Sequence, residues 1–241
     1  MYTAILNEAA VSVIRQDYLA HRPQTFVGDF DLSPVDRKWL LEDKLALLVG
    51  VIADQSVPAN RAWQLPMKLR DRIGTQHWSA KWFAAHEADL LMAIQAKPAL
   101  HRFPATMAQN FTSLGQTIMT EADGDPDRLL TVSDFADLDR RLSGIRGVGP
   151  KKVNALALII VLDLRQSLTG MSESQALFDV HLARILGNLL NQSVTAAMAT
   201  AVCKQIDPTM PALVSPYLWR LDRQHRSLAS VIDAQNLKST I

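Results

Sequence analysis

Residues 142–154 read Leu-Ser-Gly-Ile-Arg-Gly-Val-Gly-Pro-Lys-Lys-Val-Asn, and they decide how the rest of the chain is interpreted. Gly147 and Gly149 flank one apolar residue, Val148, between two segments of helical periodicity. Because glycine adopts a positive φ readily and lets another backbone come close, the stretch predicts a tight hairpin between two helices. Pro150 suits the first turn of the second helix. The free N–H groups at that helix start can bind a phosphate, which predicts a sequence-independent grip on a nucleic-acid backbone.

A second pattern begins at residue 178, where the chain reads Phe-Asp-Val-His-Leu-Ala-Arg-Ile. Asp179 stands immediately before an apolar helix that carries Leu182, Ile185 and Leu186 on one face. Taken alone, the aspartate is best interpreted as a helix N-cap worth about 1 kcal/mol. The glycine hairpin, taken alone, is equally well interpreted as an ordinary turn between helices. The two patterns together are more specific than either one.

Together they resemble the helix–hairpin–helix DNA glycosylases (the HhH-GPD superfamily) that include endonuclease III. The shared pattern is Gly-Val-Gly-x-Lys-x-x-Asn, followed by Asp-x-His-x-x-Arg-Ile at the start of the next helix. A weaker similarity covers residues 47–60, where Gln55 lies at the helix end from which the family's glutamine-bearing loop enters DNA. The resemblance implies a base-excision-repair enzyme that flips a damaged base out of duplex DNA and cleaves its N-glycosidic bond.

The resemblance also assigns roles to individual residues. Lys151, two positions after the second glycine, matches the nucleophile of the bifunctional members, and Asp179 matches the catalytic aspartate. A lysine must lose its proton before it attacks a sugar carbon, and burial, a helix N-terminus or a neighbouring cation favours that loss. The last two influences are present around Lys151. An ionised aspartate can stabilise positive charge that develops on the sugar as the base leaves. The implied DNA contacts are Gly147, Val148, Gly149, Lys152, Gln55 and Arg184.

Two of these expectations have simpler alternatives. Gln55 could fill the gap left by an extruded base, or it could be a solvated helix end. His181 is expected to orient a backbone group or a carboxylate rather than to do chemistry. Most of the five tryptophans are expected in the core, although one could stack on a base.

Three features depart from the family pattern. Cys203 is the one cysteine of the chain, so the family's common four-cysteine iron–sulfur cluster is not expected. Lys151 and Asp179 are 28 positions apart (179 − 151), with residues 164–177 as extra sequence before the aspartate helix. That longer connection resembles the archaeal 8-oxoguanine glycosylases, which also lack the cluster. Val153 replaces a residue that is usually small.

Because the cluster is not expected, we expect no metal, and the resemblance implies no organic cofactor.

Helical periodicity runs through nearly all of the sequence and predicts an all-α fold. The resemblance implies that its helices form two lobes. Residues 43–154 are expected to form a helical barrel lobe that ends in the hairpin, and residues 1–42 with 155–241 the second lobe. Ser33 and Pro34 begin a helix that is expected to run to about Gln55. Residues 216–232 are expected to form the last helix, and residues 25–30 a short extended piece.

Composition leaves the class of partner open. The chain of 241 residues is 48% hydrophobic with a formal net charge of +1, an ordinary globular composition. From Arg184 to the end there are six bases and three acids, which is compatible with nucleic acid, although a solvated helix face explains the charge as well. The apolar run 155–162 is shorter than the roughly 20 residues of a membrane span.

We expect a monomeric cytoplasmic protein, nucleoid-associated if bacterial, whose partner is double-stranded DNA with a damaged base. Two rivals stay open. One is a monofunctional glycosylase in which Lys151 only binds DNA, and the other is a non-catalytic module that uses the hairpin for phosphates alone.

Overall fold

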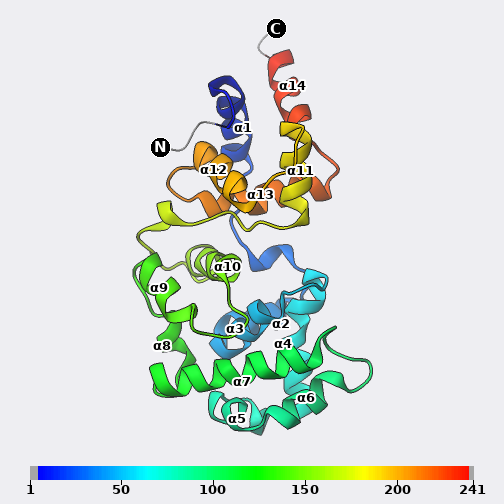
Figure 1. Cartoon of the computed structure of the whole chain (residues 1–241), viewed down its shortest axis with the longest axis vertical. Helices are drawn as coiled ribbons and strands as arrows, with labels where there is room; N and C mark the ends of the chain where they lie inside the picture. The colour runs from blue at the N-terminus through cyan, green and yellow to red at the C-terminus, as the bar shows by residue number, and fades with distance from the viewer. Residues whose placement is uncertain (1–4, 239–241) are drawn as a thin grey trace. The chain divides into compact units, whose positions relative to one another are not determined.

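The computed structural model describes the backbone of residues 5–238 and the side chains of residues 5–233, and within them the chain is all-helical (Figure 1). The all-α prediction is confirmed. The α-helices are α1 (Glu8–Ala20), α2 (Pro34–Glu42), α3 (Lys44–Ala53), α4 (Ala59–Ile73), α5 (Ala80–Ala85), α6 (Glu87–Gln95), α7 (Pro104–Glu121), α8 (Pro126–Leu130), α9 (Phe135–Leu142), α10 (Pro150–Leu162), α11 (Val180–Leu190), α12 (Ala196–Ile206), α13 (Pro211–Arg223) and α14 (Leu228–Lys238). Short 3₁₀ turns cover Val27–Asp29, Thr75–His77 and Met171–Glu173.

The helices form two compact units. One combines the described residues up to Phe26 with those from Thr169 onward, and the other is Val27–Leu168. As in the predicted lobes, the two ends of the chain share a unit. The boundaries differ from those expected, because α2 packs on α3, and α10 packs on α3 and α9. Both α2 and the whole of α10 therefore belong to the middle unit.

Helix α3 is the centre of the middle unit. Every residue from Leu45 to Ala53 is buried, and α3 contacts α2, α4, α7, α8 and α10. The prediction of one helix from residue 34 to about residue 55 is wrong, because Asp43 separates α2 from α3. Its backbone is extended (φ −91°, ψ 102°), and its side chain accepts the Ala46 N–H as an N-cap. Because of this break the apolar residues 45–53 of α3 lie in the core, whereas α2 keeps exposed positions.

Two further expectations about local structure are corrected. The predicted helix over residues 216–232 is in fact two helices, since α13 ends at Arg223 and His225 has a φ of 54°, a left-handed value that ends a helix. Residues 27–29 form a 3₁₀ turn instead of part of an extended piece. Helices α1 and α5 were not expected from the sequence.

The terminal unit is held together by tyrosine–aspartate hydrogen bonds between its two chain segments. The Tyr18 hydroxyl donates to Asp207 Oδ2 at 2.8 Å, and the Tyr217 hydroxyl donates to Asp17 Oδ2 at 2.8 Å. The two tyrosine rings meet edge to face with centroids 5.5 Å apart. Burial and the acceptor carboxylates raise the pKa of both tyrosines, so the hydroxyls stay donors. These pairs explain why α1 belongs with α12 and α13.

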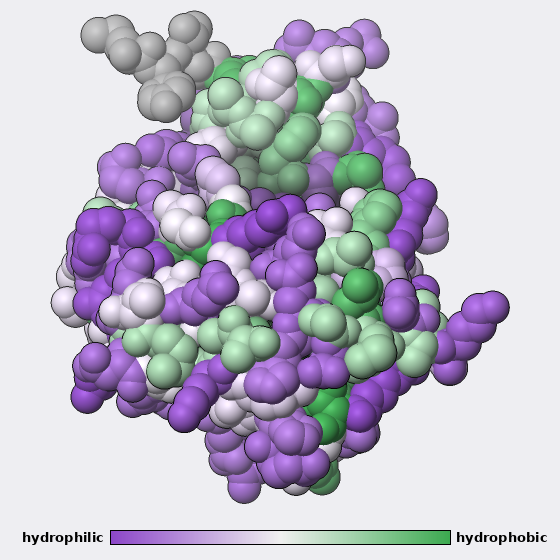
Figure 2. Space-filling model, turned by 60° about the horizontal axis from the view of Figure 1, so that its bottom comes forward, coloured by the Kyte–Doolittle hydropathy of each residue, from purple (hydrophilic) through white to green (hydrophobic). Residues whose placement is uncertain are grey.

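No helix in the described part of the chain is long and apolar enough to cross a membrane. On the face that Figure 2 displays, hydrophilic residues cover most of the surface and hydrophobic residues form small areas between them.

Candidate nucleic-acid interface

The predicted hairpin lies between α9 and α10. Gly147 has a φ of +82°, and a Cβ added there would lie 2.3 Å from Asn110 Nδ2 of α7. Asn110 is 1% exposed, so it cannot swing aside into solvent. A side chain at position 147 would therefore be disfavoured both by the positive φ and by the clash with Asn110. The positive φ expected for the hairpin is confirmed at this residue.

Gly149 differs from Gly147. Its backbone is extended (φ −111°, ψ 180°), and a Cβ added there would meet no atom within 4 Å. The fold itself therefore gives no steric reason for glycine at this position. In the described structure the N–H groups of Gly149 and Lys151 make no hydrogen bond, and Pro150 has no N–H. An open Cα face beside two unpaired donors at a helix N-terminus is suited to an anion such as a phosphate.

The three other hairpin residues named from the sequence have different environments. Val148 is 8% exposed, so its side chain packs inward and only its backbone can face a partner. Lys151 is exposed at the start of α10. Lys152 is half-buried, and its Nζ donates to the Gly147 carbonyl oxygen at 2.7 Å and to the Ile52 carbonyl oxygen at 2.7 Å. The hairpin is thus attached to the end of α3 by Lys152.

Burial lowers the pKa of Lys152 to about 8. The positive charge of Lys151 acts in the same direction, and the carboxylate of Asp54 acts against it. Lys152 is thus the half-buried lysine of the pair, and the side chain of Lys151 is open to solvent.

The end of α3 is held from a second direction by His101, which is 1% exposed. The Phe103 N–H donates to His101 Nδ1 at 3.0 Å, so Nδ1 lacks a proton and Nε2 carries it. His101 Nε2 then donates to the Ala53 carbonyl oxygen at 3.2 Å. Burial lowers the pKa of His101, which keeps the ring neutral at pH 7. Gln55, half-buried, follows two residues after Ala53.

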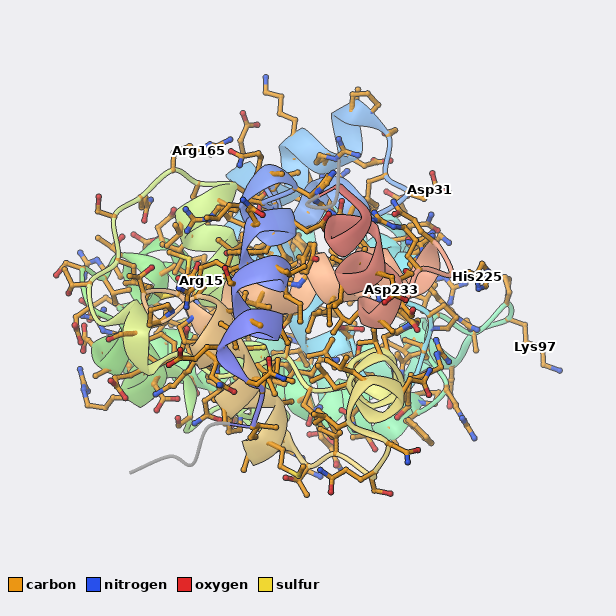
Figure 3. All side chains as sticks on the ribbon, turned by 90° about the horizontal axis from the view of Figure 1, so that it is seen from above. Arg15, Asp31, Lys97, Arg165, His225 and Asp233 are labelled. Atoms are coloured by element: carbon orange, nitrogen blue, oxygen red, sulfur yellow. The ribbon has the colours of Figure 1, made fainter. Side chains whose placement is uncertain are left out.

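Residues 96–103 form a loop whose carbonyl groups are held by two arginines of α4. Arg61 donates to the carbonyl oxygens of residues 99 and 100, and Arg72 to those of residues 93, 96 and 98. The loop presents Lys97, which points away from the ribbon (Figure 3). It also presents Phe103, whose side chain is 38% exposed and lies under the Arg102 guanidinium at 5.3 Å. Sequence reasoning missed Phe103; an aromatic residue directly after Arg102 was the available signal.

Helix α11 of the terminal unit begins at the second motif. Asp179 is its N-cap, and Oδ1 accepts the N–H groups of His181 and Leu182, each at 3.0 Å. The N-cap interpretation is confirmed. Asp179 Oδ2 has no hydrogen-bond partner among the described residues, so one carboxylate oxygen stays available. Val180, beside it, is 72% exposed.

Asp222 of α13 organises the next turn of α11. Its Oδ2 lies 2.6 Å from His181 Nδ1, and the Arg184 guanidinium pairs with both of its oxygens. The Arg184 hydrogen bonds, with His181 adding to them, hold the pKa of Asp222 at about 2. His181 therefore contacts a carboxylate, as expected. Arg184, named as a DNA contact, is 56% exposed but already paired with Asp222, which sequence reasoning missed.

The structure thus brings Gln55, Gly147, Gly149, Lys151 and Lys152 into the middle unit, and Asp179 and Arg184 into the terminal unit. Lys151 and Asp179, to which the resemblance assigns the catalytic roles, therefore belong to different units, and their joint action stays a prediction. No family model matches the chain, and no curated protein matches it.

Proposed function

We propose that the chain is a helix–hairpin–helix DNA glycosylase that releases a damaged base from duplex DNA and, through Lys151, also nicks the strand. The observation that carries the proposal is the open, extended backbone at Gly149. It places two unpaired N–H donors at the start of α10, directly beside an exposed lysine. Such a site can hold a phosphate without reading a base, and it keeps the amine near the strand that is held.

The chemistry needs two groups. Asp179 keeps Oδ2 without a hydrogen bond, and an ionised oxygen there stabilises positive charge on the sugar while the C1′–N bond breaks. The Lys151 amine, once neutral, forms a bond to C1′, and the departing base takes up a proton from water. The C1′–O4′ bond then breaks, O4′ takes up the remaining proton of the amine nitrogen, and the opened sugar stays joined to Lys151 as an imine. Removal of a C2′ proton expels the 3′ phosphate, and hydrolysis of the imine frees the lysine.

A flipped base leaves a gap in the duplex, and the middle unit offers two groups that suit it. Gln55 follows the end of α3, and Phe103 presents an exposed ring from the loop that His101 ties to the same helix end. An aromatic ring can stack on any base, and the neighbouring Lys97 and Arg102 favour a phosphate backbone.

The test is base release and borohydride trapping on a panel of duplexes that each contain one damaged base. Reduction of the imine should leave the protein covalently attached to DNA. Lys151→Gln should abolish both trapping and nicking. Lys152→Gln should retain both at saturating protein, because adjacent helical residues point about 100° apart and cannot address one sugar.

Three other outcomes would contradict parts of the proposal. Trapping that survives Lys151→Gln would move the nucleophile to another residue, with Lys152 examined first because its pKa is lowered to about 8. Base release without trapping in the unmodified chain would favour a monofunctional glycosylase. DNA binding with neither activity on a broad panel would leave a non-catalytic DNA-binding module.

A further inference from the structure

Lys152 joins two segments whose bonded residues, Ile52 and Gly147, are 95 positions apart in the sequence (147 − 52). Its Nζ donates to Ile52 at the end of α3 and to Gly147 in the hairpin, both at 2.7 Å. The Ile52 carbonyl is among the last four of α3, which lack partners within the helix. A lysine ammonium at a helix C-terminus both satisfies such a carbonyl and opposes the negative end of the helix dipole.

The two carbonyl groups that Lys152 contacts lie beside the two segments that matter for the proposed function, the turn of Gln55 and the hairpin of Gly149. The Asp54 N–H bonds back into α3, the Gln55 N–H donates to the Ala53 carbonyl oxygen at 2.7 Å, and Ser56 has a φ of 56°. The chain therefore turns sharply at the helix end that Lys152 holds, and Gln55 is on that turn. On the other side, the Gly147 carbonyl that Lys152 holds is two residues before the open face of Gly149. One ammonium group thus fixes the turn that carries Gln55 relative to the hairpin.

We propose that Lys152 is a positioning residue, which holds Gln55 at a set place relative to the phosphate-binding hairpin so that a duplex gripped by the hairpin meets Gln55 at the gap of an extruded nucleotide. This rests on the proposed function, since it assigns the hairpin to phosphates and Gln55 to the gap. Lys152 acts through these two segments and does not itself touch the sugar.

A double-mutant cycle tests the proposal without catalysis. Two duplexes are compared, one intact and one with a tetrahydrofuran residue, a stable mimic of an abasic site. The quantity measured is the ratio of their dissociation constants, which reports how well the gap is filled. The variants are Lys152→Met, which keeps the volume of the side chain and removes its donors, Gln55→Ala, and the two combined. Lys68→Met is the matched control, because Lys68 is an exposed lysine of α4 bonded to Gln64.

Each single change should lower the preference for the abasic duplex by about tenfold, the scale of a lost hydrogen bond to a charged group. In the double variant the preference for the abasic duplex should fall no further than in either single variant. Without Lys152, Gln55 is no longer held at the gap, so its removal has no additional effect. Lys68→Met should match the unmodified chain. Independent losses that multiply in the double variant would overturn the proposal, and so would a lowered melting temperature with an unchanged preference.

The pH dependence provides a second measurement that needs no change at Lys152. In a Lys151→Gln background, which removes the other lysine of the pair, the preference should fall as pH rises from about 7 to 9. An ammonium makes stronger hydrogen bonds to the two carbonyls than the neutral amine does. The other groups that face Lys152 are Asp54 and His101, and the lowered pKa of His101 keeps its ring neutral over this range.

Lys152→Arg in the same background should remove this fall, because arginine stays charged. A preference that is flat with pH while Lys152 is present would overturn the proposal. If circular dichroism shows that Lys152→Met does not fold, the pH series alone decides between these outcomes. An unmodified chain that binds both duplexes equally, or neither, would instead refute the proposed function itself.

Discussion

Lys152 Nζ lies 2.7 Å from the Ile52 carbonyl oxygen, so α10, which follows the glycine hairpin, is bonded to the end of α3. This bond and the one to the Gly147 carbonyl oxygen fix the hairpin and the turn of Gln55 to each other within the middle unit. His101 attaches the loop of Phe103 to the next carbonyl of the same helix. Two of the four changes below test groups of the middle unit, and two test groups of the terminal unit.

Gly149→Ala should weaken binding to duplex DNA of every sequence by about tenfold, because a methyl group would occupy the face where a phosphate approaches the backbone. The fold should be unaffected, since the φ of −111° suits alanine and no atom lies within 4 Å of the added Cβ. Gly144→Ala is the control, because Gly144 also has nothing within 4 Å. Fluorescence anisotropy with several unrelated duplexes measures both. Equal affinity of Gly149→Ala and the unmodified chain would reduce the hairpin to a turn.

Asp179→Asn should abolish most base release and leave stability nearly unchanged. Asparagine caps a helix about as well as aspartate, so the free energy of unfolding should change by less than about 1 kcal/mol. Loss of an electrostatic stabiliser lowers a reaction rate by about a hundredfold or more. Single-turnover kinetics measure the rate of base release, and urea denaturation measures the free energy of unfolding. A variant with near-normal release would show that Asp179 is only a cap.

Asp222→Asn should cost stability at neutral pH, and the cost should disappear in acid. The Arg184 and His181 partners lower the pKa of Asp222 from 3.8 to about 2. A lowered carboxyl pKa stabilises the fold above the unfolded value and loses that effect as pH falls through the folded one. We expect about 1 kcal/mol, because the 56% exposure of Arg184 lets water screen the pair.

Urea titrations of both chains between pH 6 and pH 2 measure this difference, which should shrink below about pH 4. A stability difference that stays constant down to pH 2 would show that packing, rather than the charge of Asp222, is responsible.

Phe103→Ala should weaken binding to a duplex with an abasic mimic more than binding to an intact one. Base–aromatic stacking contributes about 1–3 kcal/mol per base, which corresponds to a loss of roughly five- to 150-fold. Met92→Ala is the control, since Met92 of α6 is 57% exposed and lies outside the anchored loop. Competition binding with the two duplexes separates the effects. An equal loss on both would exclude a role for Phe103 at the gap.

Local features of the sequence were enough to predict what depends on near neighbours. The helical class follows from periodicity, the positive φ of Gly147 from the need for a tight turn, and the Asp179 cap from an acid directly before an apolar helix. Each of these is set within a few residues along the chain, which is the range over which backbone geometry and periodicity act.

Tertiary structure decided the rest. Asp43 could continue a helix or cap a new one, and the burial of residues 45–53 favoured the cap. Lys151 and Lys152 are adjacent and identical in type, and of the two it is Lys152 that donates to the carbonyl oxygens of Gly147 and Ile52. Asp222, 41 residues from His181, is likewise paired only by the packing of α11 on α13. Hydrogen bonds and pKa shifts of this kind depend on distances between segments, and no pattern along a single chain contains those distances.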